Sequence, residues 1–332
     1  SARCTRSQGS FLVALLEVKD LDVSFETPEG RVHAVNLLNF SIKAGETLAL
    51  VGESGSGKTQ TVMAVLGLLA ENGHVSGQAL LNGKDLLQMS TQELNQHRGN
   101  EIAMIFQDPM TSLNPYLRID QQMIEVVVHH RGLKKTEAKA KAVEILRAVH
   151  IPDPERIIRQ YPHELSGGMR QKVMVAMGLL SEPTLLIADE PTAALDVTVQ
   201  VQVTHLMSAL REKSNAASLL ISHDLGIVAG LCDRILVMYA GEAVECGSVD
   251  QIYYDPRHPY TQGLLKSVPR LDQPENKGLE AIPGNPPNLL ALPGGCKFRD
   301  RCPRAFEACS EKPPMQLSED RHAFRCFLGA SS

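Results

Sequence analysis

Apolar and polar residues alternate along the chain with two different periods, and these periods predict where strands and helices lie. Short runs that alternate or are wholly apolar favour strands at residues 15–25, 32–42, 47–51, 102–106, 185–189, 218–221 and 235–239. Apolar residues spaced three and four apart favour helices at residues 58–69, 120–150, 169–180 and 196–213. Turn-forming residues at 27–30 separate the first two strands, so we expect these strands to pair antiparallel. Strands that alternate with helices indicate an α/β domain with a largely parallel sheet.

The pattern changes near residue 255. Eleven of the nineteen prolines lie in residues 256–332, where turn signals replace the periodic segments. We therefore expect a folded domain at residues 12–255 and a loop-rich C-terminal extension at residues 256–332. Residues 1–11 are expected to be a disordered leader or an added remnant.

Composition and charge exclude several classes of protein. Of the 332 residues, 43% are hydrophobic, which excludes a fully disordered chain. The net charge is −5, from 33 basic and 38 acidic residues, and this disfavours a nucleic-acid partner. No apolar run approaches the ~20 residues that a helix needs to cross a bilayer. We therefore do not expect the chain itself to span a membrane.

A glycine-rich segment between a predicted strand and a predicted helix carries the clearest chemical signal. Residues 52–59 match the pattern G-x-x-x-x-G-K-[ST] in the context that a phosphate-binding loop requires. Glycines let backbone N–H groups converge on phosphate oxygens, and the helix N-terminus adds partial positive charge. We expect Lys58 to reach the β- and γ-phosphates of a nucleotide, and Thr59 to offer its hydroxyl to Mg²⁺. The residues expected to bind nucleotide here are Gly52, Ser54, Gly55, Gly57, Lys58 and Thr59.

Two acidic residues follow a second buried strand. Asp189 comes at the end of the apolar segment 185–188, where it can hold Mg²⁺ through water. Glu190 is next and can polarise an attacking water. An acidic pair after a strand is usually a loop or a helix start, so this interpretation depends on the phosphate loop as well.

Residues 165–171, with the sequence Leu-Ser-Gly-Gly-Met-Arg-Gln, lie between these two segments. This stretch resembles the signature motif of ATP-binding cassette (ABC) ATPases, and the order of the motifs is that of the family. Ser166, Gly167 and Gly168 begin a predicted helix, so they form an anion-binding N-terminus. The resemblance implies that this segment contacts the ATP held by a second ABC domain.

Further residues stand at positions with family roles, and they take those roles from the resemblance alone. Gln107 resembles the Q-loop glutamine, which contacts Mg²⁺ or the lytic water, and His223 resembles the switch histidine at the γ-phosphate. Asp196 resembles the D-loop aspartate, and Phe25 is the candidate side chain to stack on adenine. The expected catalytic residues are Glu190, His223 and Gln107, and the expected Mg²⁺ ligands are Thr59, Gln107 and Asp189.

Longer segments make the resemblance more specific. The chain is similar to the oligopeptide/dipeptide permease ATPases, most of all to their D-type subunits, at residues 106–115, 161–164, 193–200, 257–261 and 282–287. The implied fold is a P-loop NTPase domain of the ABC type with a mixed sheet and an antiparallel β subdomain. A helical subdomain at about residues 108–182 and a cysteine-containing C-terminal extension complete it.

Four of the seven cysteines fall in the last 37 residues, namely Cys296, Cys302, Cys309 and Cys326. Four thiolates in a proline-rich segment with little apolar material suggest a metal site that stabilises the extension. Zinc usually takes closer pairs, whereas a [4Fe–4S] cluster accepts irregular spacing. The residues alone leave a cluster, zinc and no metal open. The resemblance to the permease ATPases implies a [4Fe–4S] cluster with a structural role, with Zn²⁺ as the alternative.

The resemblance also implies a function and partners. The chain would bind and hydrolyse ATP to power a peptide importer, as a peripheral protein on the cytoplasmic face of the membrane. Its partners would be a second ABC ATPase subunit (an F-type paralogue, forming a heterodimer), two integral membrane permease subunits and, indirectly, an extracytoplasmic peptide-binding protein. The segment after Gln107 would contact the membrane subunits.

Three alternatives stay open at this point. One is an importer ATPase for a non-peptide solute. Another is a soluble ABC ATPase acting on ribosomes or DNA, which the single cassette and the acidic charge balance disfavour. The third is a non-catalytic, metal-binding regulator that uses ATP as a structural ligand. The residues that disfavour it are Lys58, Asp189, Glu190 and His223.

Overall fold

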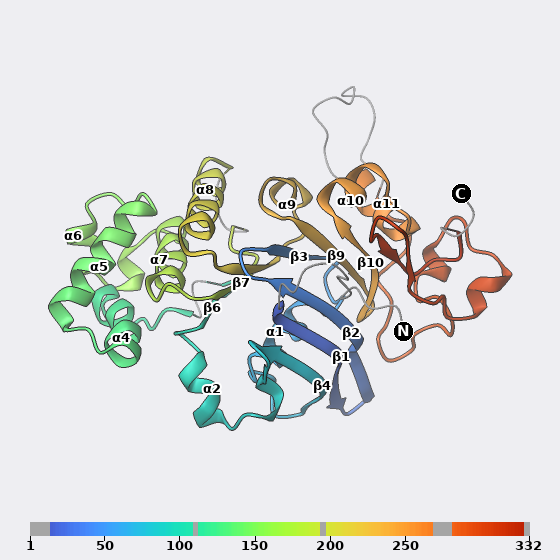
Figure 1. Cartoon of the computed structure of the whole chain (residues 1–332), viewed down its shortest axis with the longest axis horizontal. Coiled ribbons are helices and arrows are strands. Elements are labelled where there is room, and N and C mark those ends of the chain that lie inside the picture. Colours follow the sequence, from blue (N-terminus) through green and yellow to red (C-terminus); the bar gives the residue numbers. More distant parts are fainter. Residues whose placement is uncertain (1–13, 109–111, 193–196, 268–280, 329–332) are drawn as a thin grey trace. The chain divides into compact units, whose positions relative to one another are not determined.

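The computed structural model describes residues 14–108, 112–192, 197–267 and 281–328. The chain divides into two compact units, each described by itself. The first comprises Ser1–Lys43, Thr47–Gln88 and Ile221–Ser332, and the second comprises Ala44–Glu46 and Met89–Leu220. Figure 1 labels most of the helices and strands of both units. The domain limits expected from the sequence, at residues 12–255 and 256–332, stay predictions.

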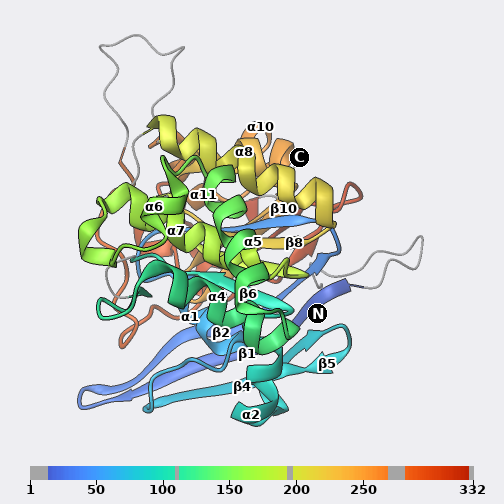
Figure 2. The same ribbon diagram turned by 90° about the vertical axis from the view of Figure 1, so that its left-hand side faces the viewer.

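An antiparallel sheet in the first unit follows from the two predicted N-terminal strands. Strands β1 (Ala14–Thr27) and β2 (Gly30–Lys43) pair across a tight turn, which confirms the expected antiparallel pair. Val18 lies opposite Phe40, and both side chains are buried, so one face of the pair packs inward. Strands β4 (Gly73–Leu81) and β5 (Lys84–Asp85) extend the sheet in the order β2-β1-β4-β5. Figure 2 shows β1, β2 and β4 as long adjacent strands.

A second group of strands in the first unit positions the glycine-rich segment. Its order is β11-β12-β10-β9-β3. Strand β3 runs parallel to β9, whereas β9 and β10 are antiparallel, so the sheet is mixed as expected. All five residues of β3 are buried, so the strand is covered on both faces. This explains why its sequence is almost continuously apolar. The bounds are β3 (Thr47–Val51), β9 (Arg234–Tyr239), β10 (Glu242–Ser248), β11 (Gln316–Leu317) and β12 (Ala323–Phe324).

The helices of the first unit are short. The helix expected at residues 58–69 is α1 (Lys58–Val65), which ends early because Gly67 takes the left-handed conformation (φ 62°) that terminates helices. The other helices are η1 (Leu86–Gln88), α9 (Leu225–Leu231), α10 (Val249–Tyr254), α11 (Pro259–Lys266), η3 (Arg299–Arg301) and η4 (Glu307–Ser310).

The second unit contains a parallel strand pair and a group of helices. Strands β6 (Ile102–Ile105), β7 (Leu185–Asp189) and β8 (Ala217–Ile221) lie in the order β8-β7-β6, and β6 is parallel to β7. The helices are α2 (Thr91–His97), α4 (Ile119–Arg131), α5 (Lys135–Ala148), α6 (Pro154–Ile157), η2 (Pro162–Glu164), α7 (Gly167–Leu180) and α8 (Val197–Ser214). Helices α4, α5, α6 and α7 pack together (Figure 1). In the described ranges no helix has both the length and the apolar character of a membrane span.

The single helix expected at residues 120–150 is two helices. Gly132 follows α4 in the left-handed conformation (φ 63°), which ends that helix, and α5 begins three residues later. The buried residues of α5 are Ala138, Ala142 and Leu146, spaced four apart on the face that packs inward.

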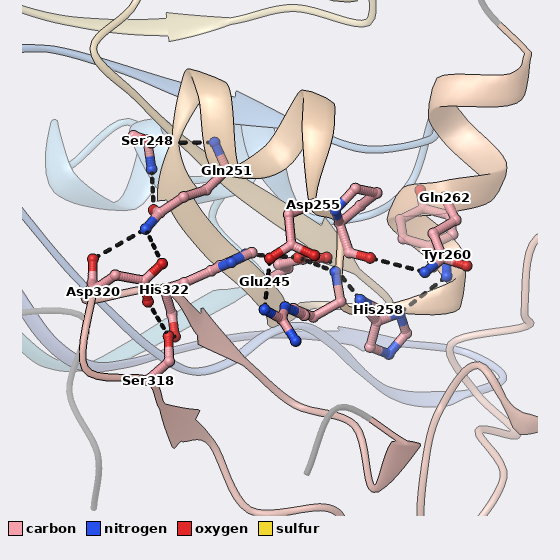
Figure 3. A network of polar contacts seen from close by, with 12 residues as sticks. Glu245, Ser248, Gln251, Asp255, His258, Tyr260, Gln262, Ser318, Asp320 and His322 are labelled. Atoms are coloured by element: carbon pink, nitrogen blue, oxygen red, sulfur yellow. Dashed lines mark hydrogen bonds and ion pairs between the residues drawn. The ribbon is translucent and has the colours of Figure 1, made fainter. Parts of the chain in front are cut away.

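A buried carboxylate ties the C-terminal residues to strand β10 (Figure 3). Glu245 is fully buried and accepts hydrogen bonds from the backbone N–H groups of Arg257 (2.6 Å) and His258 (2.9 Å). His322 contacts the same carboxylate through Nε2 at 2.7 Å. His258 then caps helix α11, since its Nδ1 accepts from the backbone N–H of Tyr260 at 3.1 Å. Burial of a carboxylate is tolerated here because three groups hydrogen-bond it.

Candidate nucleotide-binding site

The glycine-rich segment forms a tight loop between β3 and α1. Gly52 (φ 155°) and Gly57 (φ 100°) have backbone conformations that residues with side chains rarely adopt. A Cβ atom on Gly57 would lie 2.3 Å from the carbonyl oxygen of Ala34, and one on Gly52 would lie 2.3 Å from that of Met238. Only glycine therefore allows the backbone to pass so close to its neighbours, as a phosphate-binding loop requires.

Lys58 lies inside this loop. Its side chain is 7% exposed, and its Nζ donates to the carbonyl oxygens of Gly52 (2.7 Å) and Glu53 (2.9 Å). Ser54 and Gly55 are exposed at the tip of the loop, and Thr59 is half-buried in the first turn of α1. The loop thus presents a lysine, a hydroxyl and the N-terminus of a helix within eight consecutive residues.

His223 shares a cavity with the loop. This cavity has a volume of about 370 Å³ and is lined by Val51, Gly52, Glu53, His223, Asp224, Leu225, Leu264 and Ser267. The exposed ring of His223 follows β8, where the Ser222 N–H bonds the Leu50 carbonyl at 3.3 Å. Asp224 Oδ1 caps α9 by accepting from the N–H of Gly226 at 2.8 Å. The segment that carries His223 is therefore held on both sides.

Phe25 lies elsewhere in the first unit. It is half-buried on β1, opposite Val32 of β2 and Gly73 of β4. Its ring covers Gly73, where an added Cβ atom would lie 2.9 Å from Phe25 Cε1. Stacking of Phe25 on adenine stays a prediction.

The second unit brings Gln107 and Glu190 into contact. The parallel pairing of β6 and β7 places Ile105 opposite Ala188, so the residues that follow both strands emerge at the same edge. There Gln107 Nε2 donates to Glu190 Oε2 at 2.8 Å. Asp189 is 3% exposed at the end of β7. A carboxylate held by a glutamine at a strand end is suited to orienting a water molecule.

The backbone of Glu190 is unusual. Its φ is 46°, a left-handed conformation that is uncommon for a residue with a side chain. The next residue is fixed from α7, because Gln171 is fully buried and donates through Nε2 to the Pro191 carbonyl at 2.6 Å. These contacts hold the carboxylate in one place after β7.

The Ser-Gly-Gly segment begins α7, as expected. Ser166 Oγ accepts from the N–H of Met169 at 3.3 Å and so caps the helix. Ser166 and Gly167 are exposed, and an added Cβ atom on Gly167 would meet nothing within 4 Å. This N-terminus of a 14-residue helix is thus open to an anion from another molecule.

The residues predicted to bind and hydrolyse nucleotide come from both units. The loop, His223 and Phe25 belong to the first unit, whereas Gln107, Asp189, Glu190 and the Ser-Gly-Gly segment belong to the second. Asp196 lies outside the described residues, as does the leader expected at residues 1–11.

The four cysteines of the extension all lie in described residues. Cys296, Cys302 and Cys309 are half-buried, Cys326 is buried, and none of these four cysteines forms a disulfide. The backbone N–H of Cys296 donates to the Cys309 carbonyl at 3.0 Å. Burial is the main cause that raises the pKa of the Cys296 thiol to about 11, and the negative charges of the three other thiolates contribute to this rise. In the described ranges no three His, Cys, Asp or Glu side chains form a group that fits a metal ion.

Two residues that contact the loop were not expected from the sequence. Arg301 Nη1 and Nη2 donate to the Glu53 carboxylate at 2.6 Å and 2.9 Å. Tyr260 Oη accepts from the backbone N–H of Glu53 at 2.8 Å. No signal in the sequence points to these two residues, because neither belongs to a motif that marks a nucleotide site.

Comparison with known proteins gives two family matches. Residues 35–193 match the family described as "ABC transporter", and residues 244–309 match "Oligopeptide/dipeptide transporter, C-terminal region". The oligopeptide transport ATP-binding protein of Salmonella typhimurium is 54% identical over 313 residues, which are 94% of this chain and 93% of that protein. The corresponding protein of Bacillus subtilis is 50% identical over 317 residues, which are 95% and 88% of the two chains.

Solved structures give the same fold. A dimeric ATP-binding cassette in a post-hydrolysis state, with ADP and phosphate bound, has a TM-score of 0.65 at 24% identity and covers 70% of this chain and 98% of its own. An ATP-binding subunit of an ABC transporter has a TM-score of 0.59 at 28% identity and covers 72% and 91% of the two chains. The expected ABC-type fold is confirmed. The chain belongs to the ABC ATPases, in the family of oligopeptide/dipeptide transporter ATP-binding subunits.

Proposed function

We propose that this chain is the ATP-hydrolysing subunit of a peptide importer. The observation that carries the proposal is similarity along the whole chain, since relatives named for oligopeptide transport match both the cassette and the C-terminal extension. ATPases that share only the cassette would lack the second match. Oligopeptides or dipeptides are therefore the proposed cargo, with a non-peptide solute as the alternative.

The residues of the first unit bind the triphosphate in this proposal. Backbone N–H groups from Gly52 to Thr59 surround the phosphates, and Lys58 exchanges its carbonyl partners for the β- and γ-phosphate oxygens. His223 contacts the γ-phosphate from the same cavity. Phe25 stacks on adenine.

The residues of the second unit activate water. Gln107 orients the Glu190 carboxylate through their hydrogen bond. Glu190 accepts a proton from the water that attacks the γ-phosphorus, the bond from that phosphorus to the bridging oxygen breaks, and ADP leaves with this oxygen. Thr59, Gln107 and Asp189 are the proposed Mg²⁺ ligands, directly or through water. Mg²⁺, when bound, offsets negative charge on the phosphate oxygens.

A second ABC ATPase completes the site. Ser166, Gly167 and Gly168 form an exposed helix N-terminus, which suits a phosphate held by another molecule. Asp196 lies in the proposed interface. Because each ATP then contacts both subunits, ATP binding favours the closed pair and hydrolysis weakens it. We propose an F-type paralogue as the partner, in a heterodimer.

In this proposal, closing and opening of the two ATPase subunits drive two membrane permease subunits. The segment 108–115 follows Gln107 directly in the sequence. We propose that this segment contacts the permease subunits, which places the chain peripherally on the cytoplasmic face of the membrane. An extracytoplasmic binding protein delivers the peptide.

The four cysteines of the extension are the proposed ligands of a [4Fe–4S] cluster, with Zn²⁺ as the alternative. Two observations support a shared ligand: none of the four cysteines forms a disulfide, and the backbone N–H of Cys296 donates to the carbonyl of Cys309. A cluster is larger than one ion, so its cysteines need not converge on a single point. The cluster would crosslink a segment with little apolar core.

The test is transport by the assembled complex. The chain, its partner ATPase and the two permease subunits are reconstituted in vesicles with the binding protein, and uptake of labelled peptides is measured. We expect ATP-dependent peptide uptake that Lys58→Ala abolishes. Failure of the chain to assemble with the permease subunits would contradict the importer assignment. Uptake of another solute in place of peptides would overturn the cargo while leaving the ATPase assignment intact.

A further inference from the structure

Arg301 connects the cysteine-bearing segment to the phosphate loop. It ends helix η3, directly before Cys302, and is separated from Glu53 by 248 positions in the sequence. Its two terminal nitrogens each bond one oxygen of the Glu53 carboxylate, at 2.6 Å and 2.9 Å. Such paired bonds between a planar guanidinium and a carboxylate are the strongest form of this interaction.

The guanidinium is held in a built site. The Arg301 side chain is 7% exposed, and its Nε donates to the Pro283 carbonyl at 2.9 Å. Its Cζ lies 5.9 Å from the ring centres of both Tyr239 and Phe298. The hydrogen bond to Glu53 raises the pKa of Arg301, so the charge is retained. The arginine side chain is therefore held by contacts on several sides.

Glu53 is fixed at three points. Arg301 holds its carboxylate, Tyr260 Oη accepts from its N–H at 2.8 Å, and Lys58 Nζ donates to its carbonyl at 2.9 Å. Two of these three partners come from the C-terminal part of the chain. The conformation of the second residue of the loop thus depends on residues far outside the loop.

The negative charge of Glu53 affects how well the loop can bind phosphate. The loop collects an anion of several negative charges, and Glu53 lines the same cavity as His223. An unpaired carboxylate there repels the phosphates, because like charges a few ångström apart in a partly buried site interact strongly. Arg301 neutralises that carboxylate through the two hydrogen bonds.

We propose that Arg301 is a positioning residue of the nucleotide site, which sets the affinity of the loop for ATP by pairing with Glu53. The C-terminal extension is then part of the nucleotide site. This inference rests on the proposed binding of ATP at the loop. It requires no metal in the extension.

The test measures affinity of the full chain for a fluorescent ATP analogue with Mg²⁺. Arg301→Gln leaves the carboxylate unpaired, and we expect the Kd to rise about tenfold. In Glu53→Gln/Arg301→Gln the repulsion is absent, so the Kd should return to within about threefold of the unchanged chain. Glu53→Gln alone should bind at least as tightly as the unchanged chain. The matched control is Arg299→Gln, because Arg299 lies in the same turn and bonds only the neighbouring Asp300 among the hydrogen bonds described for its side chain.

Salt and turnover separate this role from a merely structural one. The effect of Arg301→Gln on Kd should shrink as ionic strength rises, since salt screens repulsion. In the assembled transporter the same variant should raise KM for ATP while kcat changes little. Arg301→Lys should restore part of the affinity, because lysine keeps the charge without the paired geometry.

Two outcomes would overturn the inference. One is an unchanged Kd in Arg301→Gln, and the other is a double variant that binds as weakly as Arg301→Gln. If Arg301→Gln does not fold, Glu53→Gln decides, because weaker binding in that variant contradicts repulsion. Lys58→Ala separates this inference from the proposed function: ATP binding that survives Lys58→Ala would refute the nucleotide site itself.

Discussion

Acid should weaken the attachment of the C-terminal extension through His258. The ring is 1% exposed, and its Nδ1 must be unprotonated to accept the hydrogen bond that caps α11. Burial is the main cause that lowers the pKa of His258 from the ordinary 6.5 to about 4, and the positive charges of Arg304 and Arg325 contribute to this decrease. The Glu245 carboxylate acts in the opposite direction but does not prevail.

The loss of folding stability in acid follows from the different proton affinities of the folded and unfolded chain. Because the folded pKa is lowered, the unfolded chain binds more protons between pH 6.5 and 4. The stability supplied by the neutral ring is complete above pH 6.5 and is lost as the pH falls toward 4. At pH 5 the loss from this one histidine is about 2 kcal/mol, since each pKa unit corresponds to ~1.4 kcal/mol.

Thermal or urea unfolding at pH 7 and pH 5, followed by circular dichroism, measures this loss. His258→Asn removes the titrating ring while its amide oxygen can still cap α11. We expect the difference between the two pH values to be about 2 kcal/mol smaller in this variant. His163→Asn is the matched control, because the His163 ring is exposed and stacks on Tyr161. Equal pH dependence in the unchanged chain and in His258→Asn would refute the reasoning.

Three other changes test separate parts of the molecule. Gly57→Ala should cost at least about 2 kcal/mol in thermal unfolding and abolish nucleotide binding, because its Cβ atom would lie 2.3 Å from a backbone oxygen. Gly55→Ala has open space and should cost only about 1 kcal/mol, so equal costs would contradict the steric argument. Glu190→Gln can keep the bond from Gln107, so ATP affinity should persist while turnover falls roughly 10²–10⁴-fold; normal turnover would remove Glu190 from the base role. Cys302→Ser should lose the brown colour and iron of the purified chain, and unchanged metal content would refute the proposed cluster.

The parts of the fold that depend on local sequence were predictable. The turn at residues 27–30 and the alternating strands around it predict the β1–β2 pair, and the four consecutive apolar residues of β3 predict a buried strand. Strand β4 was not expected, because its sequence has few apolar residues and its pairing with β1 stabilises it. One glycine, Gly132, turned an expected long helix into two.

The candidate site also has features that the sequence predicts and features that only the structure shows. The loop could be recognised because its eight residues are consecutive, and its chemistry depends on their order. The contact between Gln107 and Glu190 follows only from the register of β6 and β7. The pairing of Arg301 with Glu53 joins residues 248 positions apart without any motif, so no sequence pattern marks it.

The left-handed backbone conformation at Glu190 lowers the folding stability of the chain at the position of its proposed catalytic carboxylate. Glycine adopts φ 46° without strain, whereas glutamate there costs on the order of 1 kcal/mol of folding free energy. Selection for thermal robustness alone would therefore favour glycine at this position. At this position the carboxylate favours catalytic turnover at the expense of folding stability. Stabilising substitutions should therefore be sought elsewhere in the chain.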